Sequence, residues 1–140
     1  MSFVPVSAPR SLQRLPDVSI ATRTARSLTR GYERDQVVFR FSGVFARKIG
    51  LTSATRMRAY WDTVTLTLRL SSCVEADAAG RSALRRGGSA IEIRYPHTDL
   101  WQSIVPVKCD RVPVRVIDSG PQTCDLDLSC LAPTHKPNPQ

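Results

Sequence analysis

The stretch FSGVFARKIGL, residues 41–51, decides the fold, because it sets one short helix between runs that alternate like β-strands. Ser42 is a favourable N-cap residue, since its hydroxyl can accept a hydrogen bond from a free backbone N–H of the first turn. Gly50 suits the position after a helix, where the backbone often turns left-handed. The sequence therefore predicts a helix of two turns over residues 43–49, entered from a strand and left through a turn.

Apolar and polar residues alternate on both sides of this helix. In the run TVTLTLRL, residues 63–70, every second residue is apolar, which is the pattern of a strand with one buried face. Residues 18–29 are rich in β-branched side chains and arginine and are read as a first strand. Turns are expected at Gly31 with the charged run Tyr32–Asp35, and at Asp62–Thr63. The predicted core strands are residues 37–41, 56–62, 64–70, 91–95, 111–117 and 124–129.

The parity of these strands selects the side chains that we expect to be buried. Apolar residues at every second position face the core, and the residues between them face solvent. The predicted buried set is Phe39, Phe41, Ile49, Met57, Trp61, Leu66, Leu68, Ile93, Val114, Val116, Leu126 and Leu128. Cys124 and Cys130 share the parity of the last strand's apolar residues, which predicts buried free thiols.

The unit of strand, short helix, strand, turn and strand cannot bury both of its faces alone. Two interleaved units can close a small barrel, which removes exposed sheet edges. The predicted fold class is therefore mostly β, a small β-barrel with one or two short helices. An internal pseudo-two-fold repeat is left open, because pattern rather than identity supports it. The expected organisation is an extended N-terminal arm at 1–17, a barrel domain at 18–130 with repeats 36–70 and 90–130 joined by a linker at 71–89, and a C-terminal tail at 131–140.

The positive charge is confined to one half of the chain. The formal net charge is +8. Residues 1–70 carry twelve basic and four acidic side chains, a difference of eight, whereas residues 71–140 carry eight of each. This asymmetry favours a polyanion as the partner of the first half. The alternative is that the arginines serve as an ordinary solvated surface.

Residues 37–70 resemble the core of the AbrB/SpoVT group of swapped-hairpin β-barrel proteins. In that group a strand leads into a short helix with an R-x-x-L-G-like end, an acidic or Gly-Asp turn, and two further strands. Here Arg47–Leu51 occupy the helix end, Ser42 stands for the usual proline, and Ala54–Thr55 stand for the usual Gly-Asp. The chain also resembles, more loosely, small uncharacterised bacteriophage proteins with an arginine-rich first strand. The resemblance implies a swapped-hairpin-like barrel.

The AbrB-like resemblance also implies that DNA contacts come from arginines on the N-terminal strands and loops. The arginine fork binds phosphate with two hydrogen bonds and can read guanine edges. The candidate nucleic-acid-binding residues are Arg23, Arg26, Arg30, Arg34, Arg47 and Lys48. For Arg40, Arg58 and Arg69, on the polar strand faces, a role in solubility is favoured.

The sequence shows no catalytic constellation. A Ser-His-Asp or Cys-His site needs a positioned base, and His97 and His135 lie in Pro-flanked or terminal segments. The four cysteines form no C-x-x-C pair, so their spacing does not favour a zinc site. Asp125 and Asp127 share the outer face of a strand, where a solvated edge is favoured over a cation site. We therefore expect no enzymatic activity, no metal and no cofactor.

Two classes of function remain. The first is a small basic nucleic-acid-binding β-barrel, a DNA-binding regulator of phage or bacterial origin that acts in transcription regulation. The alternative is a structural or accessory subunit of a phage particle, with extended arms that clamp neighbouring subunits. The expected partners are DNA and further copies of the chain, or other assembly proteins. No apolar run approaches the roughly 18–20 residues of a membrane span, so we expect no membrane partner and a place in the cytoplasm of the bacterial host cell, or in the virion for the alternative.

Overall fold

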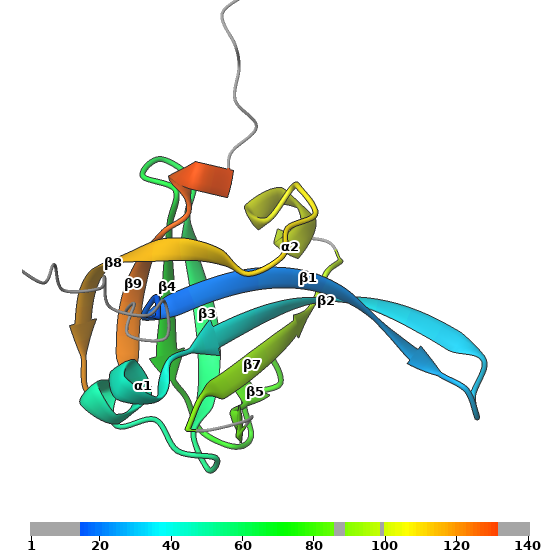
Figure 1. The fold of residues 1–140 in the computed structure, drawn as a ribbon, viewed down its shortest axis with the longest axis horizontal. Coiled ribbons are helices and arrows are strands. Elements are labelled where there is room, and N and C mark those ends of the chain that lie inside the picture. The colour runs from blue at the N-terminus through cyan, green and yellow to red at the C-terminus, as the bar shows by residue number, and fades with distance from the viewer. Residues whose placement is uncertain (1–14, 86–88, 99, 132–140) are drawn as a thin grey trace, which may run out of the picture.

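The computed structural model of the chain describes residues 15–85, 89–98 and 100–131. Within them, one antiparallel sheet of nine strands, in the order β5-β3-β4-β9-β8-β1-β2-β7-β6, curls into a nearly closed barrel (Figure 1). The mostly β barrel fold predicted from the sequence is confirmed. Of the terminal arms predicted at 1–17 and 131–140, residues 1–14 and 132–140 lie outside the described residues. The elements are β1 (Val18–Ser27), β2 (Tyr32–Phe41), α1 (Gly43–Ile49), β3 (Arg56–Asp62), β4 (Thr67–Ser72), β5 (Arg81–Ser82), β6 (Leu84–Arg85), β7 (Ile91–Pro96), α2 (Leu100–Ile104), β8 (Val112–Gly120), β9 (Thr123–Asp127) and the 3-10 turn η2 (Ser129–Leu131).

The helix α1 forms where its caps predict it. The Ser42 hydroxyl accepts a 3.1 Å hydrogen bond from the Phe45 N–H, as an N-cap does. Gly50 has φ of 77° and ψ of 29°, the left-handed conformation that ends helices. Phe45 and Ile49 are buried, so the helix packs its apolar face on one end of the barrel. Among the described residues, none of the helices has the length and apolar character to cross a membrane.

The strand order stays approximately the same when strands of the first half of the chain are exchanged with those of the second half. β2 pairs with β7, and β4 pairs with β9, both antiparallel. Phe39 lies opposite Ile93, 54 positions later, and Arg69 lies opposite Asp125, 56 positions later. Exchanging β2 with β7, β3 with β8 and β4 with β9 keeps these neighbours together. An internal repeat would produce this order, and the repeat itself stays a prediction.

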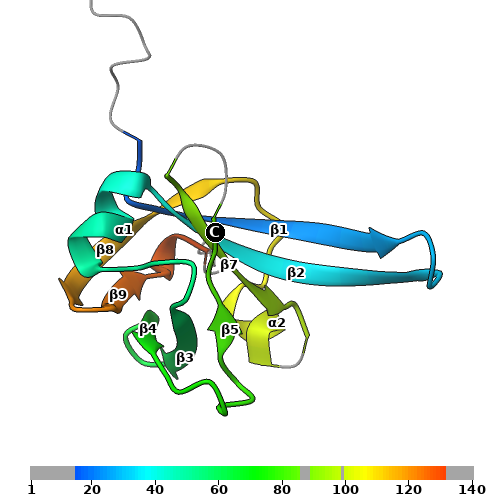
Figure 2. The ribbon, with the colours of Figure 1, turned by 90° about the horizontal axis from the view of Figure 1, so that it is seen from below.

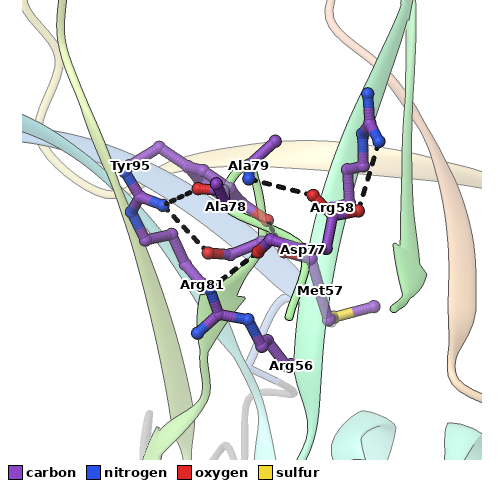
Figure 3. A network of polar contacts seen from close by, with 9 residues as sticks. Arg56, Met57, Arg58, Asp77, Ala78, Ala79, Arg81 and Tyr95 are labelled. Carbon is purple, nitrogen blue, oxygen red and sulfur yellow. Dashed lines mark hydrogen bonds and ion pairs between the residues drawn. The ribbon is translucent and has the colours of Figure 1, made fainter. Parts of the chain in front are cut away.

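The barrel closes where the short strands β5 and β6 lie between β3 and β7. β5 pairs with β3, and β6 pairs with β7. Beside them, the Tyr95 hydroxyl on β7 donates a 2.8 Å hydrogen bond to the Met57 carbonyl on β3 (Figure 3). The Tyr95 ring also stacks on Trp101 of α2, with ring centroids 4.5 Å apart. Burial raises the pKa of the Tyr95 phenol, so the hydroxyl stays a donor across this junction.

Two arginines of β3 fasten the segment that precedes β5 (Figure 3). Arg58 donates to the Asp77 carboxylate at 3.2 Å, and Arg56 donates to the Asp77 carbonyl at 2.8 Å. The same carboxylate accepts a hydrogen bond from the Ala79 N–H, which together with Arg58 lowers the pKa of Asp77. Part of the region interpreted from the sequence as a linker at 71–89 is thus held against the barrel by side-chain contacts.

The core follows the predicted parity. Nine of the twelve residues expected to be buried are buried. Trp61 and Val116 are partly buried and pack against the core cluster. Leu66 is also only partly buried, because it belongs to the turn before β4 and has φ of 54°.

Two turns differ from those expected. Between β3 and β4 the turn is longer than Asp62–Thr63, because the Asp62 carboxylate accepts hydrogen bonds from the N–H groups of Val64 and Thr65. Val64 is therefore exposed rather than part of a strand. At the other site, Tyr32–Asp35 continue β2 instead of forming a turn, because the chain has already reversed at Gly31, which has φ of 66°.

The two thiols that were predicted to be buried differ in their exposure. Cys124 on β9 is buried, and that burial raises the pKa of its thiol to about 12. Cys130 is exposed, so its predicted burial is wrong. The reason is that β9 ends at Asp127 and the chain turns into η2, which breaks the alternation that had placed Cys130 inside.

Replacing Tyr95 with Phe tests the closure of the barrel. Y95F keeps the ring and removes the hydrogen bond to the Met57 carbonyl. We expect a loss of about 1–3 kcal/mol in the free energy of unfolding, since a buried acceptor loses its partner. Urea unfolding followed by tryptophan fluorescence measures it. Y60F is the control, because Tyr60 on β3 is exposed, and a Y95F loss no larger than that of Y60F would contradict the role of the bond.

The Arg69–Asp125 pair predicts a dependence of stability on pH. Arg69 binds both carboxylate oxygens of Asp125, at 2.8 and 3.0 Å, and this contact lowers the pKa of Asp125. The contribution of the pair is therefore complete above the unfolded pKa of about 3.9 and is lost as the pH falls through the lower folded value. D125N should be less stable than wild type at pH 7, and the difference should be smaller at pH 2.5. R69Q should behave likewise, and a difference that is equal at both pH values contradicts the assignment.

Candidate nucleic-acid interface

A two-stranded ribbon projects from the barrel (Figures 1 and 2). It consists of the outer parts of β1 and β2, residues 23–35, and is called the ribbon arm. At its root the Thr22 N–H donates to the Cys109 carbonyl at 2.8 Å, and the Asp35 carbonyl accepts from the His97 N–H at 2.9 Å. Beyond these points, the strands pair only with each other as far as the structure describes the chain. Both backbone edges of the arm are therefore open.

A tight turn closes the arm at its tip. Ser27 lies opposite Tyr32, and the Ser27 carbonyl accepts a 2.9 Å hydrogen bond from the Gly31 N–H. The Ser27 hydroxyl accepts a second bond from the Arg30 N–H at 3.2 Å. Gly31 is needed here, because its positive φ would strain a side chain. These local bonds hold the two strands of the arm in register without support from the barrel.

Four of the six candidate binding residues lie on the ribbon arm, namely Arg23, Arg26, Arg30 and Arg34. The register puts Arg23 and Arg34 on one face, Arg26 on the other face, and Arg30 in the turn. Arg26 lies 3.1 Å from the Glu33 carboxylate, and both side chains are mostly exposed. The Arg34 guanidinium lies over the Tyr32 ring, 5.0 Å from its centroid. The arm therefore carries arginines on both of its faces and in its turn.

The other two candidates lie elsewhere. Arg47 and Lys48 are exposed in the last turn of α1, at the end of the barrel away from the arm tip (Figure 2). Arg47 donates to the Ser89 hydroxyl at 3.1 Å. The structure thus brings together the four arginines of the arm and separates them from the helix cations.

Behind the arm, the outside of the sheet carries three arginines around one buried carboxylate. Glu92 on β7 is only 2% exposed. Its Oε1 lies 3.6 Å from Arg40 and 3.9 Å from Arg23, and its Oε2 lies 3.5 Å from Arg94. Arg94 Nε is itself buried and has no hydrogen-bond partner among the described residues. Within the described residues, the three guanidiniums and the one carboxylate of this group carry two excess positive charges.

Glu92 and Arg94 were missed by the sequence analysis. Both fall at outward positions of the alternating run AIEIRY, residues 90–95, so parity alone assigns them to solvent. Their importance comes from the register of β2 against β7, which sets Arg40 opposite Glu92. Periodicity within one strand carries no signal for such a pairing.

The three arginines for which a role in solubility is favoured each pair with an acid. Arg40 contacts Glu92, Arg58 contacts Asp77, and Arg69 contacts Asp125. Each arginine comes from residues 1–70 and each acid from residues 71–140, so folding neutralises part of the charge asymmetry in the sequence.

A hollow beside the root of the arm is lined by both positive and negative side chains. Its volume is about 600 Å³, and its lining includes Arg34, Arg94 and His97 but also Glu33 and Asp35. Mixed charges of this kind do not define an anion site. Among the described residues, no group of three histidine, cysteine or acidic side chains is placed to hold a metal ion.

Comparison with protein-family models, with curated proteins and with solved structures finds no match for this chain. The AbrB-like resemblance of residues 37–70 therefore stays a prediction.

Replacing Glu92 with Gln tests the organisation of the three arginines. E92Q keeps the shape of the side chain and removes its charge, so Arg23, Arg40 and Arg94 repel one another without a central anion. We expect a loss of about 1.5–3 kcal/mol in unfolding free energy, the range for bonds to charged groups. Sodium sulfate should restore more of it than sodium chloride at equal ionic strength. E75Q, at an exposed site, is the control, and an E92Q protein as stable as E75Q contradicts the central role of Glu92.

Proposed function

We propose that the protein binds nucleic acid, with duplex DNA as the preferred form, through the ribbon arm and the arginines at its root. The observation that carries the proposal is a two-stranded ribbon that projects from the barrel and bears four arginines. In this proposal the protein is a DNA-binding regulator of phage or bacterial origin, acting as a homo-oligomer or through its internal two-fold pattern.

The dimensions of the arm suit a DNA groove. Paired strands lie about 4.8 Å apart, so a two-stranded ribbon is narrow enough for the major groove, which is about 12 Å wide. Residues 23–27 extend about 3.3 Å each, which gives a projection of about 16 Å before the turn. A ribbon of that length can enter the groove while its root stays beside the phosphates.

The positions of the arginines suggest a division of roles. Arg30, in the turn, is the first to reach base edges, where arginine binds guanine with two hydrogen bonds. Arg23 and Arg34, on one face, and Arg26, on the other, are placed for phosphates on either side of the groove. The exposed Arg26–Glu33 pair is no obstacle, since exposed pairs contribute only about 0–1 kcal/mol.

A second candidate is an assembly subunit, of the kind found in phage particles. The observation in its favour is the open backbone edge on each side of the arm, since unpaired strands readily pair with another chain. Leu28 at the tip is 99% exposed, and an apolar tip suits burial against a neighbouring protein. In this reading the arm clamps a neighbouring subunit.

The test compares two triple variants with the same change in charge. The arm variant is R26A/R30A/R34A, and the matched control is R85A/R111A/R115A, which removes three exposed arginines that are not among the six candidate binding residues. If each arm arginine contacts one phosphate, the arm variant flattens the slope of log K against log salt by about 2.7, which is 0.9 for each contact on duplex DNA. Electrophoretic shift or fluorescence anisotropy measures the slope with a random duplex between 50 and 200 mM salt.

The control variant separates the arm from general positive charge. We expect it to keep nearly all of the wild-type slope. Equal losses in both variants contradict the arm as the interface. If the wild type binds neither duplex nor single strands at about 0.1 M salt, the assembly reading takes over, and light scattering of a variant with a shortened arm then measures its role in oligomerisation.

A further inference from the structure

We infer that a hollow on the outside of the barrel, where α1 begins, binds the phosphate group of a small organic molecule. Its volume is about 500 Å³, within the roughly 300–1,000 Å³ of small-molecule sites. Its walls come from segments far apart in the sequence: the approach to β1, the junction of β2 with α1, residues 89–90 and the start of β8. This site lies outside the ribbon arm, although it shares Arg40 with the group of arginines behind the arm, and it does not rest on DNA binding.

The charged side chains that line the hollow are positive. Arg40 and Arg111 both line it, and the lining residues that the structure describes include no aspartate or glutamate. Arg40 touches Glu92, but that carboxylate is buried in the sheet and is shared with two further arginines. Its negative charge therefore orients Arg40 and leaves the hollow positive. An anion is the ligand that this field favours.

Hydroxyl groups add donors beside the two arginines. The Ser42 oxygen accepts from the Phe45 N–H, and the Ser89 oxygen accepts from Arg47. Each hydroxyl therefore still has its own hydrogen to donate. Two guanidiniums and two hydroxyls match the several acceptor oxygens of a phosphate monoester, and arginine forks bind such groups with paired hydrogen bonds.

The rest of the wall is apolar. Leu15, Pro16, Ala90 and Pro113 line the hollow together with the polar groups. An inorganic phosphate ion would leave this surface and most of the volume unused. A phosphate carried on a compact organic body, such as a nucleoside, fills both parts, and the exposed face of Leu15 gives that body something to pack against.

Arg111 is held in a backbone conformation that residues other than glycine seldom adopt. Its φ is 50°, just before β8 begins. Such strain persists when the surrounding structure enforces it, and it often marks a ligand site. The conformation supplies a sharp test, because glycine at this position relieves the strain while removing the guanidinium.

The probes are adenosine 5′-monophosphate, adenosine and inorganic phosphate, titrated into the full chain by calorimetry at about 0.1 M salt. We expect the monophosphate to bind at least 10-fold more tightly than either other probe. No binding of the monophosphate at millimolar concentration overturns the proposal. Equal binding of inorganic phosphate overturns the organic part of the ligand, and equal binding of adenosine overturns the phosphate contact.

Three variants assign the contact. R111G and R111A should each weaken monophosphate binding at least 10-fold, and R111G should be at least as stable as wild type on heating because its backbone strain is relieved. R115A is the matched control, since Arg115 on β8 has the same charge, is 75% exposed and pairs with Asp127. Unchanged binding in R111G overturns the assignment of Arg111.

Failure of this site and failure of the arm are distinguishable. The arm variant R26A/R30A/R34A should bind the monophosphate as wild type does, whereas R111G should keep the wild-type salt slope on duplex DNA. A loss of monophosphate binding in the arm variant would mean that the ligand binds to the arginines of the arm, which overturns the hollow as its site.

Discussion

The register of β2 against β7 is the constraint on which the rest of the structure depends. On the inner side it sets Phe39 opposite Ile93 in the centre of the core. On the outer side it sets Arg40 opposite Glu92, around which the other two arginines gather. Because side chains alternate with a period of two, a slip of one residue would exchange these faces. One pairing thus fixes both the hydrophobic core and the charged surface.

Closure of the barrel explains why the arm is the exposed feature. An antiparallel sheet with open edges is prone to pair with other chains, and here the short strands β5 and β6 fill the gap between β3 and β7. The ribbon arm departs from this rule, since it extends past the last contacts with β7 and with Cys109. A sheet that nearly closes itself elsewhere but leaves the two long edges of the arm unpaired supports the proposal that the arm meets a partner.

Local signals predicted the elements well, and long-range pairings account for what they missed. Alternation located the strands, and the Ser42 and Gly50 caps located α1 within the described chain. Alternation continues formally through Leu66 and Cys130, but side-chain caps and a 3-10 turn interrupt it there. The charged run at 32–35 resembled a turn because it is polar. It is polar because these strand residues lie in the solvent-exposed arm outside the barrel, and the chain does not reverse there. Of the candidate site, the sequence supplied the arm arginines but neither Glu92 nor the hollow beside Arg111, since both exist only after distant strands pair.

The ion pairs formed on folding change the conclusion that the charge composition alone favours. A basic first half and a balanced second half favour a polyanion partner, yet folding pairs first-half arginines with second-half acids, as Arg58 with Asp77 and Arg69 with Asp125 show. Charge segregation along a chain is therefore weak evidence of a partner when antiparallel strands bring the two halves together. The stronger evidence is the positive charge that survives pairing. It survives on the arm, where Arg30 lies in an exposed turn, and at the hollow, where Arg40 is oriented by a buried acid and Arg111 by a strained backbone. These are the two places where we propose that anions bind, a polymer at the arm and a small molecule at the hollow.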